Sequence, residues 1–159
     1  MDEAGIDIQV LSHGAPSAQK LPADTAVAIT RGVNDRLAAA CAANPKRFAA
    51  FAALPTADPK AAADELERCV TKLGFKGAML HGLANGIFLD DQRFWPIYER
   101  AVKLDVPIYM HPGLPDARVM ELHVAPTEIV FEASAWIITP VSKSDTLLRR
   151  SVVVTSVCP

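Results

Sequence analysis

Apolar residues in the first 111 positions fall into short continuous runs that alternate with stretches of helical period. The runs cover residues 6–12, 48–54, 75–80 and 106–110, and turn-forming or polar residues close each of them. Short apolar runs bounded in this way are typical of buried strands. The chain is therefore predicted to contain four strands in this part.

Between the runs, apolar residues recur every three or four positions, as on one face of a helix. The predicted stripes are Val27, Ile29, Val33, Leu37 and Cys41, then Leu66, Val70 and Leu73, then Phe94, Ile97, Tyr98, Ala101 and Leu104. Trp95 is assigned with Phe94 to the core.

Local signals mark where these helices begin and end. Asn44-Pro45 ends the first helix, since the residue before proline avoids helical dihedrals. Asp58 and Pro59 suit the N-cap and first position of the second helix, and Gly74 suits its C-terminal stop. Pro96 is expected to kink the first turns of the third helix, and Asn85-Gly86 predicts a tight turn.

The alternation of strand and helix requires parallel strands joined by right-handed crossovers, so the fold class is α/β. An open doubly wound sheet and a (β/α) barrel both satisfy it. No GxGxxG or GxxxxGK follows a strand, and three strand ends carry a histidine: His13, His81 and His111. Both features favour the barrel, whose carboxyl rim collects catalytic groups.

A complete barrel needs about 200 residues or more, whereas this chain has 159. The sequence therefore predicts a partial TIM-type (β/α) barrel of about four strand–helix units. Residues 1–136 are assigned to it. Residues 137–159 are a divergent tail expected to lie outside the barrel, with an isolated β-prone run at 151–157.

The amino-acid composition limits the classes of molecule that this protein is expected to bind. Half of the residues are hydrophobic, 21% are charged and the net charge is -2, with no basic block. These values indicate a folded domain and argue against nucleic acid as a partner. No secretory signal or membrane-spanning stretch is present, and the odd, widely spaced Cys41, Cys69 and Cys158 form no disulfide framework. We expect a cytoplasmic protein without a membrane partner, in which Cys41 and Cys69 are buried thiols.

Three stretches resemble the amidohydrolase-related metal-dependent decarboxylases. They are MDEAGIDIQVLSHGAP, RFAAFAALPTADPKAAADELERCV and LGFKGAMLHGLANGIFLDDQRFWPIYERAVKLDVPIYMHPGLP. The likeness is greatest to the 2,3-dihydroxybenzoate and γ-resorcylate decarboxylases and covers about residues 1–136.

The resemblance implies a distorted (β/α) barrel with one divalent metal, zinc, manganese or magnesium, and a small aromatic carboxylic acid as substrate. It also implies a homo-oligomer. His111 matches the family's metal-binding histidine at the end of its fifth strand. The remaining metal ligands and the catalytic residues have no counterpart here and are expected outside this chain. The resemblance therefore implies a barrel that is incomplete at both ends, as in a truncated gene product or incomplete gene model. The isolated chain is expected to bind metal poorly.

For each candidate residue a second interpretation stays open. His111 alternatively ends its strand as a hydrogen-bonded polar residue. His81 and His13 are candidate substrate-binding residues, but His81 also fits a loop hydrogen bond and His13 a cap on the turn at Gly14. Asp90 and Asp91 resemble a carboxylate pair, although a helix cap is favoured for Asp91. His123 is assigned to the surface.

Three hypotheses follow. The first is a metal-dependent carboxy-lyase that removes CO2 from a hydroxylated aromatic acid, with the isolated chain inactive. The second is a hydrolase of the same superfamily, in which a metal-bound hydroxide attacks an ester or amide. The third is a non-catalytic fragment.

Overall fold

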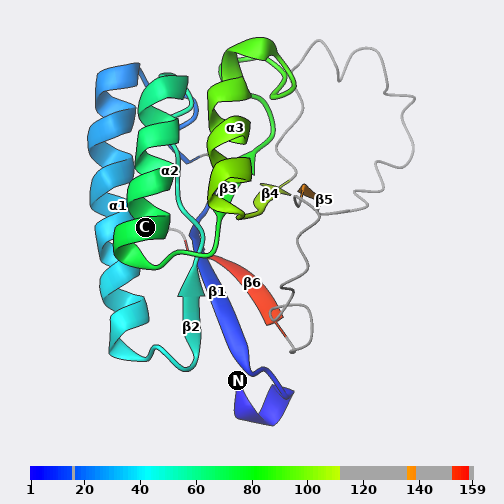
Figure 1. The fold of residues 1–159 in the computed structure, drawn as a ribbon. Helices are drawn as coiled ribbons and strands as arrows, with labels where there is room; N and C mark the ends of the chain where they lie inside the picture. Colours follow the sequence, from blue (N-terminus) through cyan, green and yellow to red (C-terminus); the bar gives the residue numbers. More distant parts are fainter. Residues whose placement is uncertain (16, 112–135, 139–151, 158–159) are drawn as a thin grey trace, which may run out of the picture.

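The computed structural model describes residues 1–15, 17–111, 136–138 and 152–157 of the chain. Helices and strands alternate through most of this part (Figure 1). Along the chain the elements are η1 (Asp2–Ala4), β1 (Ile8–His13), α1 (Ala23–Ala43), β2 (Phe48–Ala50), α2 (Pro59–Leu73), β3 (Ala78–His81), η2 (Gln92–Phe94), α3 (Trp95–Leu104), β4 (Ile108–His111), β5 (Trp136–Ile138) and β6 (Val152–Val157).

The first four strands are parallel and adjacent in chain order. β1 pairs with β2, and β3 pairs with β4. A parallel bridge between Ala52 and Ala78 joins the two pairs, with the Met79 amide donating to the Ala52 carbonyl at 3.0 Å. This arrangement confirms the α/β class predicted from the alternation of strand and helix.

Two further strands flank this set. β5 pairs antiparallel with β4, and β6 runs parallel to β1. Residues 152–157 are therefore a strand against β1 and not an isolated run. Most of 112–151 lies outside the described residues, so the expected boundary between barrel and tail at residue 136 stays a prediction.

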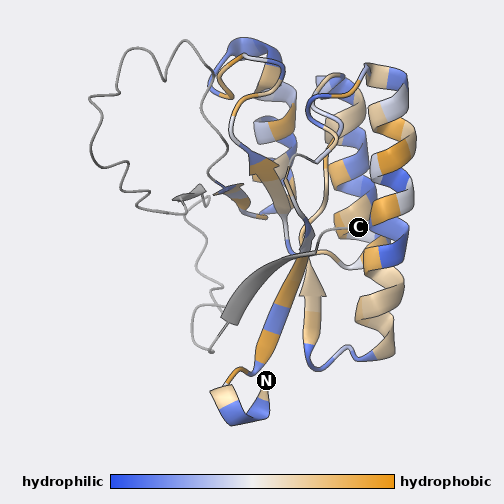
Figure 2. Ribbon diagram, turned by 180° about the vertical axis from the view of Figure 1, so that it is seen from behind, coloured by the Kyte–Doolittle hydropathy of each residue, from blue (hydrophilic) through white to orange (hydrophobic). Residues whose placement is uncertain are grey.

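The three helices lie together on one side of the strands, which both views show (Figures 1 and 2). The main core fills the space between these layers, and it includes Leu54, Leu66, Leu80, Ile97 and Ile108. A smaller apolar cluster comprises Val10, Phe51 and Met79, with Tyr109 packed against it. Because successive strand residues point to opposite faces, this second cluster lies on the face turned away from the helices.

The ends of α2 confirm the sequence prediction. The Asp58 side chain accepts from the Ala61 amide at 3.0 Å, Pro59 is the first helical residue, and Gly74 adopts φ 73° after the last turn. Asn85 and Gly86 likewise have φ of 50° and 77°. Local capping and turn chemistry decides these positions, so it can be read from short stretches of sequence.

The buried face of α1 differs from the predicted stripe. Ala26, Thr30, Asn34 and Leu37 are buried, whereas Ile29 is 41% exposed. Thr30 donates its hydroxyl hydrogen to the Ala26 carbonyl at 2.8 Å, so this polar group is satisfied inside the helix. The helix therefore turns a partly polar face inward.

The start of α3 also differs from the prediction made for Pro96. Pro96 produces no kink within a longer helix. The 3-10 turn η2 precedes α3, and Pro96 lies in the first turn of α3, where a missing N–H needs no partner. In the described part of the chain, no helix is long and apolar enough to cross a membrane.

Candidate functional site

Two of the three predicted histidines meet at the carboxyl ends of neighbouring strands. His81 and His111 end β3 and β4 and are direct register partners. Their ring centroids are 5.1 Å apart, with the planes tilted by 52°. Strand alternation places both on the same face as Met79 and Tyr109, away from the helices.

His81 is held in a defined state by its neighbours. It is only 5% exposed, and its Nε2 lies 2.9 Å from the carbonyl oxygen of His13. A carbonyl only accepts hydrogen bonds, so Nε2 must bear the hydrogen and Nδ1 is left with a lone pair. Burial lowers the pKa of His81; the bond to His13 acts in the opposite direction, and nearby His111 and His13 lower the pKa further. The ring is therefore neutral at neutral pH.

His13 lies close to this pair through its backbone and not through its ring. Because strand side chains alternate, the His13 side chain points to the opposite face of β1 from those of Val10 and Ser12. Its Nδ1 lies 3.3 Å from the Ser17 hydroxyl. The Ser17 amide donates to the Gly14 carbonyl at 2.9 Å, which closes the turn after β1. Burial lowers the pKa of His13. The contacts to the turn agree with the capping interpretation, and a role for the His13 ring in substrate binding stays a prediction.

His111 is partly buried at the last position of β4. Imidazole nitrogens suit zinc and similar divalent metals, so the paired rings of His81 and His111 are chemically suitable donors. Sites for such ions need three or four protein ligands. Within the described residues no group of three or more histidine, cysteine, aspartate or glutamate side chains is arranged to hold a metal. The described residues alone therefore do not complete a metal site.

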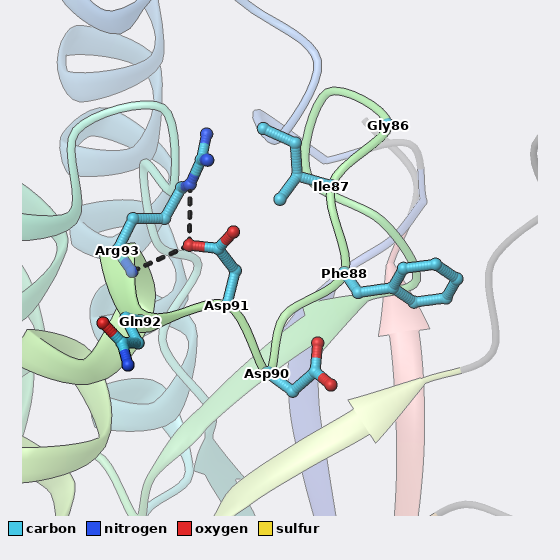
Figure 3. Close-up of a pocket in the computed structure, with 7 residues that line it drawn as sticks. All are labelled: Gly86, Ile87, Phe88, Asp90, Asp91, Gln92 and Arg93. Carbon is cyan, nitrogen blue, oxygen red and sulfur yellow. Dashed lines mark hydrogen bonds and ion pairs between the residues drawn. The ribbon is translucent and has the colours of Figure 1, made fainter.

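The two neighbouring aspartates do not form a carboxylate pair. Asp91 Oδ1 accepts from the backbone amide and from Nε of Arg93, both at 2.9 Å. These bonds hold the pKa of Asp91 below its usual range. The Asp90 carboxylate points in a different direction along an open polar groove of about 660 Å³ (Figure 3). Asp91 is the N-cap of η2, as the sequence predicts.

A second groove of about 640 Å³ lies beside the ends of β3 and β4. It is mainly apolar and is lined by Gly82, Leu83, Phe88, Leu89, Asp90, Trp95, Tyr98 and Met110. Trp95 is 50% exposed, so its assignment to the core is wrong, whereas Phe94 is buried as predicted. The spacing of the α3 stripe, which runs through Phe94, Ile97 and Ala101, already leaves Trp95 off the buried face.

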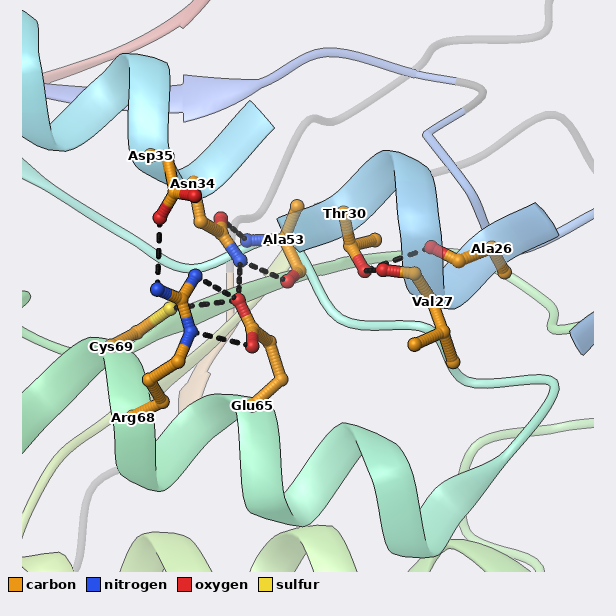
Figure 4. Close-up of polar contacts among 9 residues, drawn as sticks. All are labelled: Ala26, Val27, Thr30, Asn34, Asp35, Ala53, Glu65, Arg68 and Cys69. Atoms are coloured by element: carbon orange, nitrogen blue, oxygen red, sulfur yellow. Dashed lines mark hydrogen bonds and ion pairs between the residues drawn. The ribbon is translucent and has the colours of Figure 1, made fainter. Parts of the chain in front are cut away.

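A buried polar cluster between α1 and α2 was not predicted from the sequence (Figure 4). Asn34 donates to the Ala53 carbonyl at 3.0 Å and to Glu65 at 2.8 Å, and its Oδ1 accepts from the Ala53 amide at 2.9 Å. Arg68 binds Glu65 through two nitrogens, at 2.7 and 2.8 Å, and Asp35 at 2.8 Å. Because its buried polar groups are paired with one another, this cluster joins the helices to the strand layer.

Glu65 stays ionised within this cluster. Burial raises its pKa, but the bonds from Arg68 and Asn34 outweigh burial, so the pKa lies below the usual value. The Cys69 thiol is 3.5 Å from Glu65, and burial together with that carboxylate raises the pKa of the thiol. Cys69 is therefore a buried neutral thiol, as predicted, whereas Cys41 is only partly buried.

Gln19 is the other polar residue that sequence patterns missed. It lies in the loop after β1, is 1% exposed, and accepts a hydrogen bond from the His81 backbone amide through Oε1. Residues 19 and 81 are far apart in the chain, and nothing in the local sequence around Gln19 indicates the contact.

The sequence profile of the family Amidohydrolase (Amidohydro_2) matches residues 1–147. The chain belongs to this amidohydrolase family. The resemblance seen in the sequence is thereby confirmed, and it extends to decarboxylases within the family.

Three relatives illustrate the relation. The γ-resorcylate decarboxylase of Rhodococcus jostii is 44% identical over 136 residues, which cover 77% of this chain and 41% of the relative. The crystal structure of 2,6-dihydroxybenzoate decarboxylase from Rhizobium is 44% identical with a TM-score of 0.71, and the match covers 77% of this chain and 41% of that one.

The third relative is a dihydroxybenzoic acid decarboxylase from Polaromonas sp. JS666, crystallised with manganese and the inhibitor 2-nitroresorcinol. It is 44% identical with a TM-score of 0.71, over 77% of this chain and 40% of that chain. This amidohydrolase-family chain thus spans about two fifths of the length of the relatives it matches.

Proposed function

We propose that this chain forms part of a metal-dependent carboxy-lyase that removes CO2 from a hydroxylated aromatic acid. The observation that supports this most is the pairing of His81 and His111, at 5.1 Å between ring centroids, on the carboxyl ends of two parallel strands. It occurs in a chain 44% identical to a γ-resorcylate decarboxylase. In parallel α/β folds the carboxyl ends of strands are where active sites form.

In this proposal β1 to β4 are an arc of a TIM-type barrel that is incomplete at both ends. Residues 137–159 are a tail that does not belong to this arc, although residues 152–157 pair with β1. His111 is one ligand of a zinc, manganese or magnesium ion. The metal supplies charge stabilisation and orientation for the carboxylate and its neighbouring hydroxyl. The remaining ligands and the proton donor would come from outside the described residues.

His81 and His13 are proposed to contact the substrate from the rim. The neutral His81 ring offers a buried Nδ1 acceptor, which suits a hydrogen-bond donor on the substrate. His13 contributes its carbonyl, which orients His81, in addition to any contact from its ring. The whole protein is proposed to be a cytoplasmic homo-oligomer.

Two alternatives have support of their own. Membership of the amidohydrolase family keeps a hydrolase in consideration, since metal-activated water serves hydrolysis equally well. A non-catalytic chain also stays in consideration, because this chain covers only 41% of the length of a γ-resorcylate decarboxylase that it matches. We therefore expect the 159-residue chain alone to show no turnover.

A chimera tests the proposal. Residues 1–136 of this chain would replace the matching segment of the Rhodococcus jostii enzyme, so that the relative supplies the remaining ligands. We expect manganese-dependent CO2 release from 2,6-dihydroxybenzoate by the chimera and none by the chain alone. Hydrolysis of an aryl ester without CO2 release would favour the hydrolase. A folded, metal-loaded chimera with neither activity would contradict the carboxy-lyase proposal.

A further inference from the structure

Asn85 and Gly86 form the turn in the loop that follows β3, and Figure 3 shows Gly86 at its tip. Both residues have a positive φ, and Ala84 and Ile87 on either side exchange two backbone hydrogen bonds of 3.0 Å. This is the two-residue hairpin turn that Asn-Gly favours. Neither of the two bonds uses the Gly86 amide, and Asn85 is exposed to solvent.

We propose that Asn85 is a site of spontaneous covalent modification, at which the asparagine is converted to aspartate and isoaspartate. The Gly86 backbone nitrogen loses its proton and attacks the side-chain carbonyl carbon of Asn85. A carbon–nitrogen bond forms, the bond to Nδ2 breaks, and ammonia leaves. Water then opens the five-membered imide at either carbonyl, which gives aspartate or isoaspartate. Because Gly86 has no Cβ, no side chain obstructs closure of the ring.

The other two asparagines of the chain, Asn34 and Asn44, lack one of these conditions. Pro45 follows Asn44, and its nitrogen has no proton to lose, so it cannot form the imide. Asn34 is fully buried in α1, and its side chain makes three hydrogen bonds of 2.8 to 3.0 Å. Asn85 therefore combines an exposed side chain with a following amide that can attack it.

The two products affect the loop differently. Aspartate keeps the turn, because Asp-Gly suits the same backbone geometry. Isoaspartate inserts a side-chain carbon into the backbone, so Ala84 and Ile87 cannot keep both of their hydrogen bonds. Ile87 and Phe88 line the polar groove, and Phe88 also lines the apolar groove. Formation of isoaspartate thus loosens the wall that the two grooves share.

The test follows the modification of the full chain, folded and in urea, at several mildly alkaline pH values. Peptide mapping by mass spectrometry detects the exchange of an amide for an acid at each asparagine, and enzymatic methylation of isoaspartyl groups identifies the second product. We expect both products at Asn85 in the folded chain. Their rate of formation should rise in proportion to the hydroxide concentration, since the attacking amide must be deprotonated.

Asn34 is the internal control for the effect of the fold. Folding should slow its reaction roughly a hundredfold, the worth of three net hydrogen bonds. Folding should slow the reaction of Asn85 by no more than about tenfold, because an exposed turn opens at low free energy. A folded chain in which Asn85 stays intact, or in which Asn34 reacts as fast as Asn85, would overturn the proposal.

A second measurement separates the two products. Asn85→Asp supplies the aspartate form directly and is the matched control for the isoaspartate form, which is purified from the incubated wild-type chain. Hydrogen exchange of the Ala84 and Ile87 amides should be faster in the isoaspartate form and unchanged in Asn85→Asp. Equal exchange in both forms would overturn the inferred loosening of the groove wall.

Discussion

Replacing Asn34 by alanine removes the polar link between α1, α2 and the strand layer. Asn34 is fully buried and makes three hydrogen bonds of 2.8 to 3.0 Å, two of them to the backbone of Ala53. The substitution leaves the Ala53 amide and carbonyl without their partner and takes one donor from Glu65. Each net bond is worth about 1 kcal/mol, and a buried group left unpaired costs about 1–3 kcal/mol.

We therefore expect Asn34→Ala to lower the free energy of unfolding by about 3–5 kcal/mol, a large share of the roughly 5–15 kcal/mol typical of a domain. Urea unfolding followed by far-ultraviolet circular dichroism measures this loss. Arg36→Ala on the exposed side of the same helix is the control, and its effect should stay within about 0.5 kcal/mol. A loss below about 1 kcal/mol for Asn34→Ala would contradict this expectation, since the buried bonds would then contribute almost nothing to stability.

Two further predictions concern Glu65 and Gly77. The folded state lowers the pKa of Glu65, so its stabilising contribution is present above the unfolded value of about 4.3 and is lost as the pH falls through the folded value. Glu65→Gln should therefore be less stable than wild type at neutral pH and lose less stability on acidification; equal slopes of unfolding free energy against pH would contradict this. Gly77 has φ 151°, and a Cβ there would lie 2.2 Å from the Pro107 carbonyl oxygen, so Gly77→Ala should cost about 2–4 kcal/mol. The same change at Gly32, where a Cβ meets nothing within 4 Å, should be neutral or stabilising in urea unfolding, and similar losses at both glycines would argue against the close contact.

The elements set by neighbouring residues were predictable from the sequence. Asp58, Pro59 and Gly74 define the ends of α2 through contacts within a few residues, and the strand ends at His81 and His111 were located correctly. Register then brings these two histidines together, as expected for parallel strands that end at one edge.

Contacts between distant segments were not predictable in the same way. The inward face of α1 includes Asn34 because Ala53, 19 residues later, supplies its partners. A hydrophobic stripe cannot reveal that a polar residue is buried because a distant segment supplies its hydrogen-bond partners. Ile29 was therefore wrongly predicted to be buried. Gln19 escaped notice for the same reason, since its partner His81 is 62 residues away.

Metal content in the chimera tests directly whether His111 is a metal ligand. Manganese would be measured by elemental analysis after dialysis in the chimera, in its His111→Ala variant, and in a His123→Ala control at a position that the sequence assigns to the surface. We expect one equivalent of manganese and CO2 release in the chimera and the control, and loss of both in His111→Ala. Full manganese occupancy in His111→Ala would contradict the assignment of His111 as a metal ligand.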